Sequence, residues 1–223
     1  MSGTLTIPAN ELGPPAASLR PSRVRISASS PAEPVVYCEG PRVYFRPLEL
    51  EDEPLLRRWI NDPVNRRYLL HRPPLNAARE REFIESQGKT AADYTFGVVA
   101  KQGDRLIGSA GLHRVDPVNR SAVLGICIGE HAAKGRGYGR ETVRLLLQFA
   151  FEELNLNRVE LSVLAENWRA IRTYQKVGFV QEGCARQAHY RGGHYVDEYR
   201  FALLRSDWAE RYAADSPRNG ESD

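Results

Sequence analysis

The sequence is poor in cysteine: Cys38, Cys127 and Cys184 are the only three among 223 residues. Their wide spacing, with no CxxC pair, argues against a disulfide framework and against a cysteine-based zinc site. The five histidines are scattered as well, and even His189 and His194 lack the spacing of metal ligands. We therefore expect reduced thiols, a cytoplasmic location and no bound metal.

Long apolar runs are also missing. No stretch approaches the roughly 20 residues of a membrane-spanning helix, and the N-terminus lacks the basic and then apolar layout of a secretory signal. The formal net charge of +3 is too small to indicate a nucleic-acid-binding protein, although it suits an anionic small ligand. We expect neither a membrane nor a nucleic acid as a partner.

The composition divides the chain into three regions. Residues 1–40 are rich in Pro, Ala and Ser and show no helix or strand period, which predicts a flexible N-terminal tail. Residues 41–210 carry the periodic apolar patterns of one globular domain. Residues 211–223 are small and charged, so we expect a second flexible tail there.

Apolar periodicity in the domain predicts an α/β (α+β) fold, with a mixed central sheet of about seven strands flanked by helices. The expected strands are 42–48, 94–101, 105–115, 121–129, 157–165 and a final hairpin that turns at Gly192 and Gly193. The expected helices are 51–62, 76–87, one from the glycine-rich segment to Leu154, and 167–179. Asp52 is the expected N-cap of the first helix, and Gly178 is expected to end the last.

A glycine-rich loop joins the apolar strand at 121–129 to the longest helix. Gly135, Gly137 and Gly139 alternate with bulkier residues there. A helix N-terminus carries unpaired N–H groups and a positive dipole end, and glycines let a phosphate approach them closely. A tight turn with no ligand is the simpler alternative. The expected ligand-binding loop is Lys134, Gly135, Arg136, Gly137, Tyr138, Gly139 and Arg140.

Two common phosphate-binding patterns do not fit this loop. No Gly-Lys-Ser/Thr closes it as in a Walker loop. Arg140 stands where a dinucleotide-binding GxGxxG would have its last glycine, and the preceding strands do not start a βαβ unit. The pattern therefore disfavours a kinase and a dehydrogenase.

The segment KGRGYG resembles the Q/R-x-x-G-x-G/A pyrophosphate loop of the GNAT superfamily of N-acetyltransferases, which bind acetyl-coenzyme A. ENWRAIRTYQKVGF, at 166–179, resembles the superfamily's second signature, E-N-x-x-A-x-x-x-Y-x-K-x-G-F. Lys134 departs from the pattern, because it keeps the charge of Arg without its bidentate geometry. RPLELEDEPLLRRWINDP and YRGGHYVDEYRFALLRSDW further resemble the RimJ/RimL-like branch, which acetylates ribosomal-protein N-termini, polyamines and other small amines.

The resemblance implies a GNAT fold in which the strands at 121–129 and 157–165 splay apart. The pantetheine arm would then lie between them as an extra strand, bonded to the backbone of Ile126 and Ile128. Cys127 lies between these residues and invites a covalent acetyl-cysteine route, although a buried cysteine on an apolar strand is usually a packing residue. Direct transfer in a ternary complex is our expectation.

The resemblance also assigns catalytic roles. Tyr174 matches the usual proton donor to the coenzyme A sulfur, and Asn167 matches the asparagine that contacts pantetheine. Their alternatives are a packed core ring and a helix N-cap, and both roles are compatible. Glu160 is the first candidate for the general base. The further candidates are Asp197, Glu198, His113 and an ordered water.

The acceptor is expected to be a primary amine, with a protein N-terminus favoured over a polyamine, an aminoglycoside or another small amine. Residues of 57–74 and of the last hairpin are expected to line its site. The candidates are Trp59, Asn61, Asp62 and Tyr190, with Tyr68 and His189 beside them. A non-catalytic acyl-CoA-binding module is the alternative class, and a homodimer is a possible assembly.

Overall fold

A computed structural model describes residues 35–70, 74–89 and 92–212 of the chain. Its strands are β1 (Cys38–Glu39), β2 (Val43–Arg46), β3 (Tyr94–Ala100), β4 (Arg105–Asp116), β5 (Ser121–Ile128), β6 (Arg158–Leu164), β7 (Val180–Arg191) and β8 (His194–Leu204). Its α-helices are α1 (Glu53–Asn61), α2 (Pro63–Arg66), α3 (Ala77–Ser86), α4 (Tyr138–Gln148), α5 (Trp168–Val177) and α6 (Arg205–Tyr212). Short 3-10 turns cover Leu50–Asp52 and His131–Ala133, and a π-helical turn, Phe149–Glu153, continues α4.

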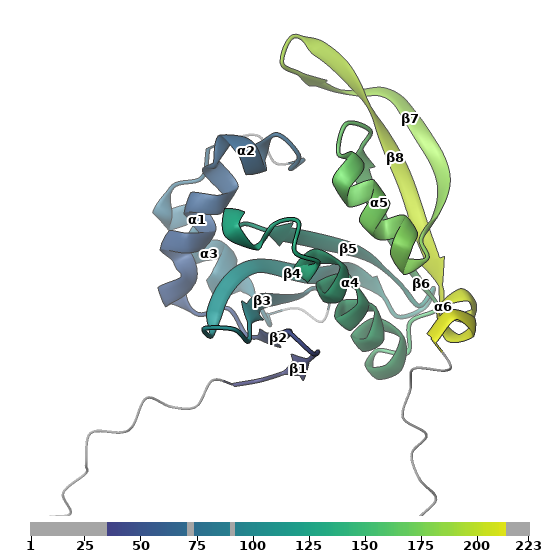
Figure 1. Cartoon of the computed structure of the whole chain (residues 1–223), viewed down its shortest axis with the longest axis horizontal. Helices are drawn as coiled ribbons and strands as arrows, with labels where there is room; N and C mark the ends of the chain where they lie inside the picture. The colour runs from purple at the N-terminus through teal and green to yellow at the C-terminus, as the bar shows by residue number, and fades with distance from the viewer. Residues whose placement is uncertain (1–34, 71–73, 90–91, 213–223) are drawn as a thin grey trace, which may run out of the picture. The chain divides into compact units, whose positions relative to one another are not determined.

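The strands form one mixed sheet in the order β1-β2-β3-β4-β5-β6-β8-β7 (Figure 1). The α/β expectation is confirmed, but the sheet has eight strands rather than about seven. The additional strand, β1, lies in the range expected to be a tail. It forms because the backbone N–H of Tyr37 donates a hydrogen bond to the carbonyl of Phe45, and the Tyr37 ring packs 5.0 Å from the Phe96 ring. Both partners are distant along the chain, so the local sequence does not predict this strand.

The other end of the fold also extends past its expected limit. Helix α6 ends at Tyr212, two residues beyond 210, because the rings of Trp208 and Tyr212 pack with centroids 4.1 Å apart. The tail predictions for 1–34 and 213–223 fall outside the described residues.

The central strands β5 and β6 are parallel neighbours that pair over only three residues. Their partners are Ser121 with Arg158, Ala122 with Val159, and Val123 with Glu160. Beyond Val123 the register stops, while β5 stays paired with β4 as far as Ile128 and β6 stays paired with β8 as far as Leu164. The expected splay between these strands is confirmed.

Helices α4 and α1 lie on opposite faces of the sheet. A Cβ on Gly139 of α4 would lie 3.7 Å from Cγ1 of Ile128, whereas a Cβ on Gly129 would overlap the Trp59 ring of α1. Because successive strand residues point to opposite faces, Ile128 marks one face and Gly129 the other. We call these the α4 face and the α1 face.

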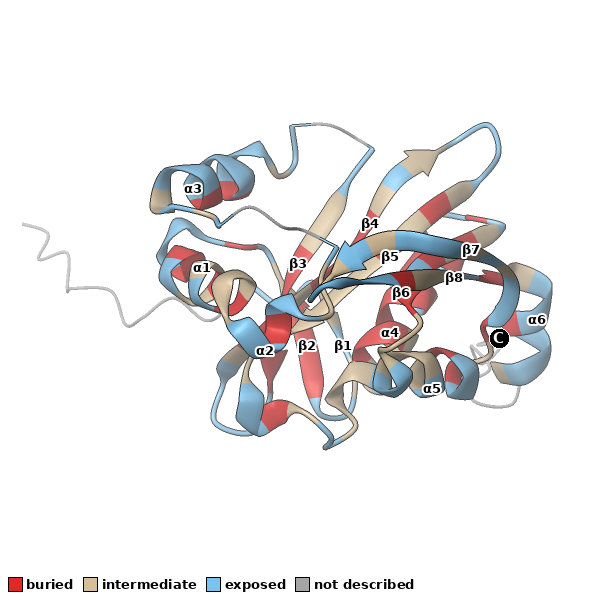
Figure 2. Cartoon of the chain, turned by 90° about the horizontal axis from the view of Figure 1, so that it is seen from above, coloured by how far each residue is buried: buried red, intermediate tan, exposed pale blue. Residues whose placement is uncertain are grey.

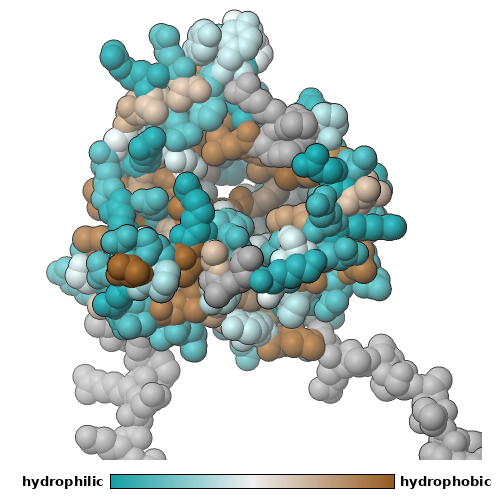
Figure 3. Space-filling model, turned by 180° about the vertical axis from the view of Figure 1, so that it is seen from behind, coloured by the Kyte–Doolittle hydropathy of each residue, from teal (hydrophilic) through white to brown (hydrophobic). Residues whose placement is uncertain are grey.

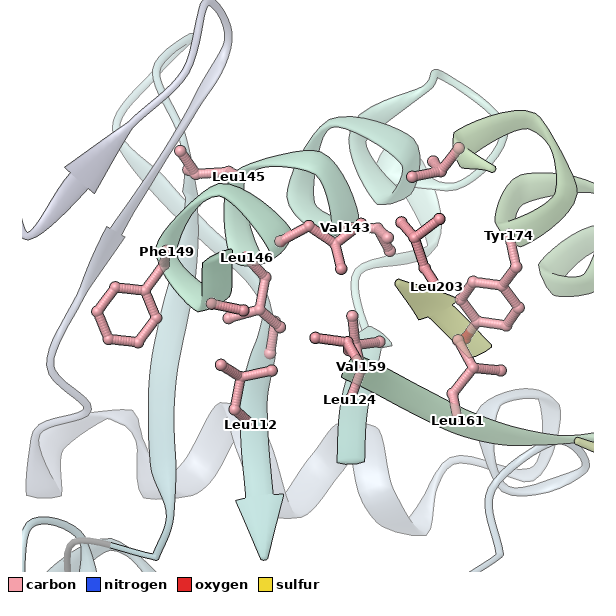
Figure 4. Close-up of a cluster of buried hydrophobic side chains, with 14 of the residues drawn as sticks. Leu112, Leu124, Val143, Leu145, Leu146, Phe149, Val159, Leu161, Tyr174 and Leu203 are labelled. Atoms are coloured by element: carbon pink, nitrogen blue, oxygen red, sulfur yellow. The ribbon is translucent and has the colours of Figure 1, made fainter. Parts of the chain in front are cut away.

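The main core lies on the α4 face. Val143 and Leu146 of α4 contact the sheet above Leu124 and Val159 (Figure 4), and each is at most 5% exposed. Burial of an aliphatic side chain of this size stabilises the fold by about 1.5–3 kcal/mol. Buried positions run along the central strands, whereas β7 has none (Figure 2).

Helix ends are only partly as expected. Gly178 ends α5 at φ 119°, as predicted. Asp52 stands before α1, but its side chain does not cap that helix. The carboxylate instead accepts from the backbone N–H of Glu49 at 2.9 Å and pairs with Arg46 at 2.7 Å, because the preceding 3-10 turn aims it back toward β2.

Candidate active site

The glycine-rich loop after β5 has the backbone of a turn that opens a helix. Gly135 and Gly137 have φ values of 76° and 87°, in the left-handed region that glycine adopts without strain. Gly137 stands at the N-cap of α4, with no side chain capping the helix. The backbone itself therefore requires two of the three glycines.

The loop presents unpaired donors. Among the described residues, none accepts a hydrogen bond from the backbone N–H groups of 135–140. These groups lie at or near the surface, at the positive end of α4. Successive N–H groups at a helix start form a concave anion site, so this loop has the chemistry of a phosphate cradle.

Gly139 is the third glycine, and the protein itself does not need it. Its φ is not positive, and an added Cβ would make only an ordinary contact, 3.7 Å from Ile128. A missing side chain that the fold does not require is explained by a ligand that approaches the backbone closely.

Arg42, which the sequence does not single out, lies across the loop. Its guanidinium donates to the carbonyl of Arg136 at 3.0 Å and pairs with Glu141 at 2.9 Å. It also lies over the Tyr138 ring, 5.1 Å from the centroid. Its partners are 94 or more residues away in sequence, so only the fold reveals that Arg42 holds the loop in shape.

Lys134 points away from the loop and toward α2. Its ammonium donates to the side-chain carbonyl of Asn65, whose amide in turn donates to the backbone carbonyl of Gly129 at 3.1 Å. Burial lowers the pKa of Lys134, although Cys127 and Asp62 oppose this effect. The predicted charge thus lies near the open end of the splayed strands, whereas the side chains of Arg136 and Arg140 are exposed.

The splayed strands expose backbone groups to each other. Gly129 donates to Ile107 of β4 at 3.0 Å, and antiparallel bonding alternates along a strand. The N–H and C=O groups of Ile126 and Ile128 therefore point away from β4 and toward β6. In the view from behind, the surface is hollowed near the middle of the molecule, below the β7–β8 hairpin (Figure 3). The backbone at Ile126 and Ile128 is thus positioned to pair with an extended ligand.

Tyr174 lies in the core, with its ring beside Leu161 and Leu203 on the α4 face (Figure 4). It is 8% exposed and packs edge-on against Phe179. Burial, with a smaller contribution from Cys127, raises the pKa of Tyr174 to about 12. The phenol is therefore protonated at neutral pH, as a proton donor must be. Asn167 caps α5, accepting from Ala170 at 3.3 Å.

Cys127 is poorly suited to act as a nucleophile. Burial raises the pKa of its thiol to about 11, although Lys134 opposes this effect. Only the thiolate attacks a thioester efficiently, and it is scarce at neutral pH when the pKa is this high.

Two of the base candidates, His113 and Glu160, lie on the α1 face. The register pairs Val123 with His113 and with Glu160, and paired residues share a face. His113 Nδ1 lies 3.2 Å from Asp93, and its Nε2 would lie 3.0 Å from a Cβ on Gly125. The imidazole thus occupies the space that a side chain there would fill.

The other carboxylates are engaged. Glu160 lies 3.4 Å from Arg158. Glu198 is 2.7 Å from His189. Burial acts to raise the pKa of Glu198, but hydrogen bonds from His189 and Ser162 outweigh it and lower the pKa. Asp197 accepts from the backbone of Gln187 at 2.7 Å.

The expected acceptor residues lie in different environments. Trp59 is 4% exposed and belongs to a second core cluster with Leu48, Leu56 and Ile84, so its ring is a packing residue here. Asn61 ties α1 to Leu75, and Asp62 caps α2 while lying 3.2 Å from His131. Tyr190 is exposed near the hairpin tip and Tyr68 is partly exposed. The sequence could not distinguish surface from core at Trp59, because both fit a helical period.

Residues 42–180 match the family described as the acetyltransferase (GNAT) domain. The N-acetyltransferase p20 of Bacillus licheniformis, itself uncharacterised, is 30% identical over 171 residues, which are 75% of this chain and 96% of that protein. The putative ribosomal N-acetyltransferase YdaF of Bacillus subtilis is 36% identical over 103 residues, 46% of this chain and 56% of that protein.

Solved structures agree. Spermidine N-acetyltransferase from Vibrio cholerae, in complex with CoA and spermine, aligns with a TM-score of 0.70 and 28% identity over 74% of this chain and 97% of that chain. A dodecameric structure of the Vibrio enzyme aligns as well. The fold and the loop therefore define an acetyl-CoA-dependent N-acetyltransferase. The chain belongs to the GNAT acetyltransferase family.

The described residues contain neither a candidate membrane-spanning helix nor a candidate metal-binding cluster. No helix in 35–70, 74–89 or 92–212 is long and apolar enough to cross a membrane. Within the same residues, no group of three or more His, Cys, Asp or Glu side chains is placed to hold a metal ion.

Gly139→Leu tests the phosphate cradle, because the family pattern accepts alanine at this position and only a larger side chain should obstruct the ligand. We expect it to weaken CoA binding by about 10-fold or more, equivalent to about 1.4 kcal/mol. The helix should be kept, since leucine favours a helix over glycine by up to about 1 kcal/mol, and thermal melts check this. Calorimetric titration with CoA measures the affinity. Gly183→Leu, where a Cβ would meet nothing within 4 Å, is the control, and wild-type affinity in Gly139→Leu would contradict the cradle.

Proposed function

We propose that the chain transfers the acetyl group of acetyl-CoA to the N-terminal amine of a protein or peptide, as a RimJ/RimL-like enzyme, by direct attack in a ternary complex. The observation that carries this proposal is the separation of β5 from β6. In the proposal, this gap connects the backbone N–H groups of the loop at 135–140 with the buried phenol of Tyr174. The similarity to YdaF, named a putative ribosomal N-acetyltransferase, supports a protein acceptor. Assembly as a homodimer remains a prediction.

In this proposal the diphosphate of CoA binds the N–H groups of 135–140, with Arg136 and Arg140 supplying positive charge and Tyr138 forming part of the wall. Lys134, whose ammonium donates to Asn65, places its charge toward the open end of the splayed strands instead. The pantetheine arm pairs with the backbone around Cys127, from Ile126 to Ile128, and contacts Asn167. The thioester then lies in the gap between β5 and β6, in the plane of the sheet. It can therefore be approached from the α4 face on one side and from the α1 face on the other. Direct transfer is supported by the high pKa of Cys127.

A polyamine acceptor is the second candidate, since the Vibrio structure contains spermine. Release of free coenzyme A, followed with a thiol reagent across peptides and polyamines, separates the two. We expect turnover with peptides that have a free N-terminus and none with the same peptides acetylated there. Turnover of polyamines alone would overturn the peptide proposal, and failure to bind acetyl-CoA would overturn the enzyme itself.

Tyr174→Phe tests the proton donor. Once the amine attacks, the tetrahedral intermediate expels the CoA thiolate, and the phenol protonates it. We expect kcat to fall by about 10- to 100-fold with the KM for acetyl-CoA unchanged, because the ring still packs. Tyr212→Phe, which removes a partly buried hydroxyl that donates to the backbone carbonyl of Val177 in α5, is the control for loss of a tyrosine hydroxyl. An unchanged kcat would remove Tyr174 from the mechanism.

The base is the remaining catalytic role. Glu160, the first candidate from the sequence, and His113 both lie on the α1 face, opposite Tyr174. We propose His113, because Asp93 lies beside its Nδ1 and orients the ring. Its Nε2 then lies over Gly125, just beyond the point where β5 and β6 stop pairing. Glu160 is the alternative, but its carboxylate lies beside Arg158.

His113→Gln and Glu160→Gln separate these bases. We expect His113→Gln to lower kcat by about 100-fold, within the range of general-base catalysis, and added imidazole to restore part of the rate. Glu160→Gln should change kcat by less than about 3-fold. Steady-state kinetics at saturating acetyl-CoA measure both. The reverse pattern would assign the base to Glu160.

A further inference from the structure

A cavity of about 460 Å³ lies between the end of α2, the residues that precede α5 and the tip of the β7–β8 hairpin. The lining residues that matter are Arg66, Arg67, Glu166, Tyr190, Arg191 and His194. Arg191 closes one side, because its guanidinium donates to the carbonyls of Arg66 and Arg67 at 3.2 Å and to that of Leu69. The hairpin tip and α2 are therefore held together around the cavity.

The cavity has an excess of positive charge. Among the described residues that line it, Glu166 is the only carboxylate, and it accepts a hydrogen bond from His194 at 2.9 Å. That bond is the main cause of the raised pKa of His194, so the pair tends to share a proton. Within the described part of the chain, neither Arg66 nor Arg67 forms an ion pair with a carboxylate. Two guanidinium groups are thus available to an anion.

The cavity also adjoins the open end of the splayed strands. On one side Asn65, next to Arg66, contacts Lys134 and the carbonyl of Gly129. On the other side Glu166 precedes Asn167, the cap of the helix that carries Tyr174. A molecule in this cavity therefore lies between the two elements that flank the proposed transfer site.

We propose that this cavity binds an acidic side chain of the acceptor peptide, close behind its N-terminal amine. The inference rests on the proposed function and narrows its substrate to peptides that carry acidic residues directly after the N-terminal residue. Guanidinium groups match carboxylates in planar, two-bonded geometry. A polyamine would instead bring like charge toward Arg66 and Arg67, which disfavours it.

Two matched peptides test the proposal with the full-length protein. One begins Ser-Glu-Glu and the other Ser-Gln-Gln, followed by the same neutral residues, and spermidine is the third acceptor. We expect kcat/KM to be at least about 10-fold higher for the acidic peptide, which corresponds to about 1.4 kcal/mol. The advantage should shrink as salt is raised, because the charges are exposed and screened.

The double variant Arg66→Gln/Arg67→Gln tests the residues. We expect it to raise the KM for the acidic peptide to that of the neutral one, while the KM for acetyl-CoA stays constant. Arg79→Gln, on the exposed surface of α3, is the matched control and should keep the preference. Thermal melts of both variants check the fold.

Three results would overturn the inference. They are equal kcat/KM for the two peptides, a preference for spermidine, and a raised KM for acetyl-CoA in the double variant, which would assign the arginines to the phosphates of the coenzyme. Absence of turnover with every amine, with acetyl-CoA still bound, would count against the proposed function instead.

Discussion

The divergence of β5 from β6 after Val123 and Glu160 is the constraint on which the rest of the molecule depends. Backbone N–H and C=O groups inside a protein need partners, and the strands stop providing them to each other at this point. Both strands remain paired members of the sheet because β4 and β8 hold their outer edges. The neighbouring strands thus maintain the separation, and an extended chain with amide groups can complete the pairing.

The loop after β5 shows how one feature can serve both fold and ligand. Gly135 and Gly137 are required by the backbone conformation, since each has a positive φ that glycine adopts without strain. Gly139 is required by neither a turn nor a close protein contact, which fits the proposed approach of the coenzyme to its backbone. Arg42, which directly precedes β2, holds this loop from the N-terminal end of the domain and couples the start of the fold to the proposed coenzyme site.

The sheet also separates the chemical roles by face. Tyr174 approaches the splay from the helix-covered α4 face, where burial keeps its phenol protonated. His113 and Glu160 lie on the α1 face. In the proposed mechanism, an amine that attacks from one side and a thiolate that leaves toward the other do not compete for space.

Local pattern was enough for much of this protein. The periodicity of α4, the end of α5 at Gly178 and the loop signature depend on neighbours within a few residues, so the sequence alone determined them and the family. The eighth strand, the burial of Trp59, the position of Arg42 and the Asp93–His113 pair depend on residues far apart in the chain. Only the tertiary structure decided these, because such contacts form when packing brings distant segments together, and no spacing along the chain encodes them.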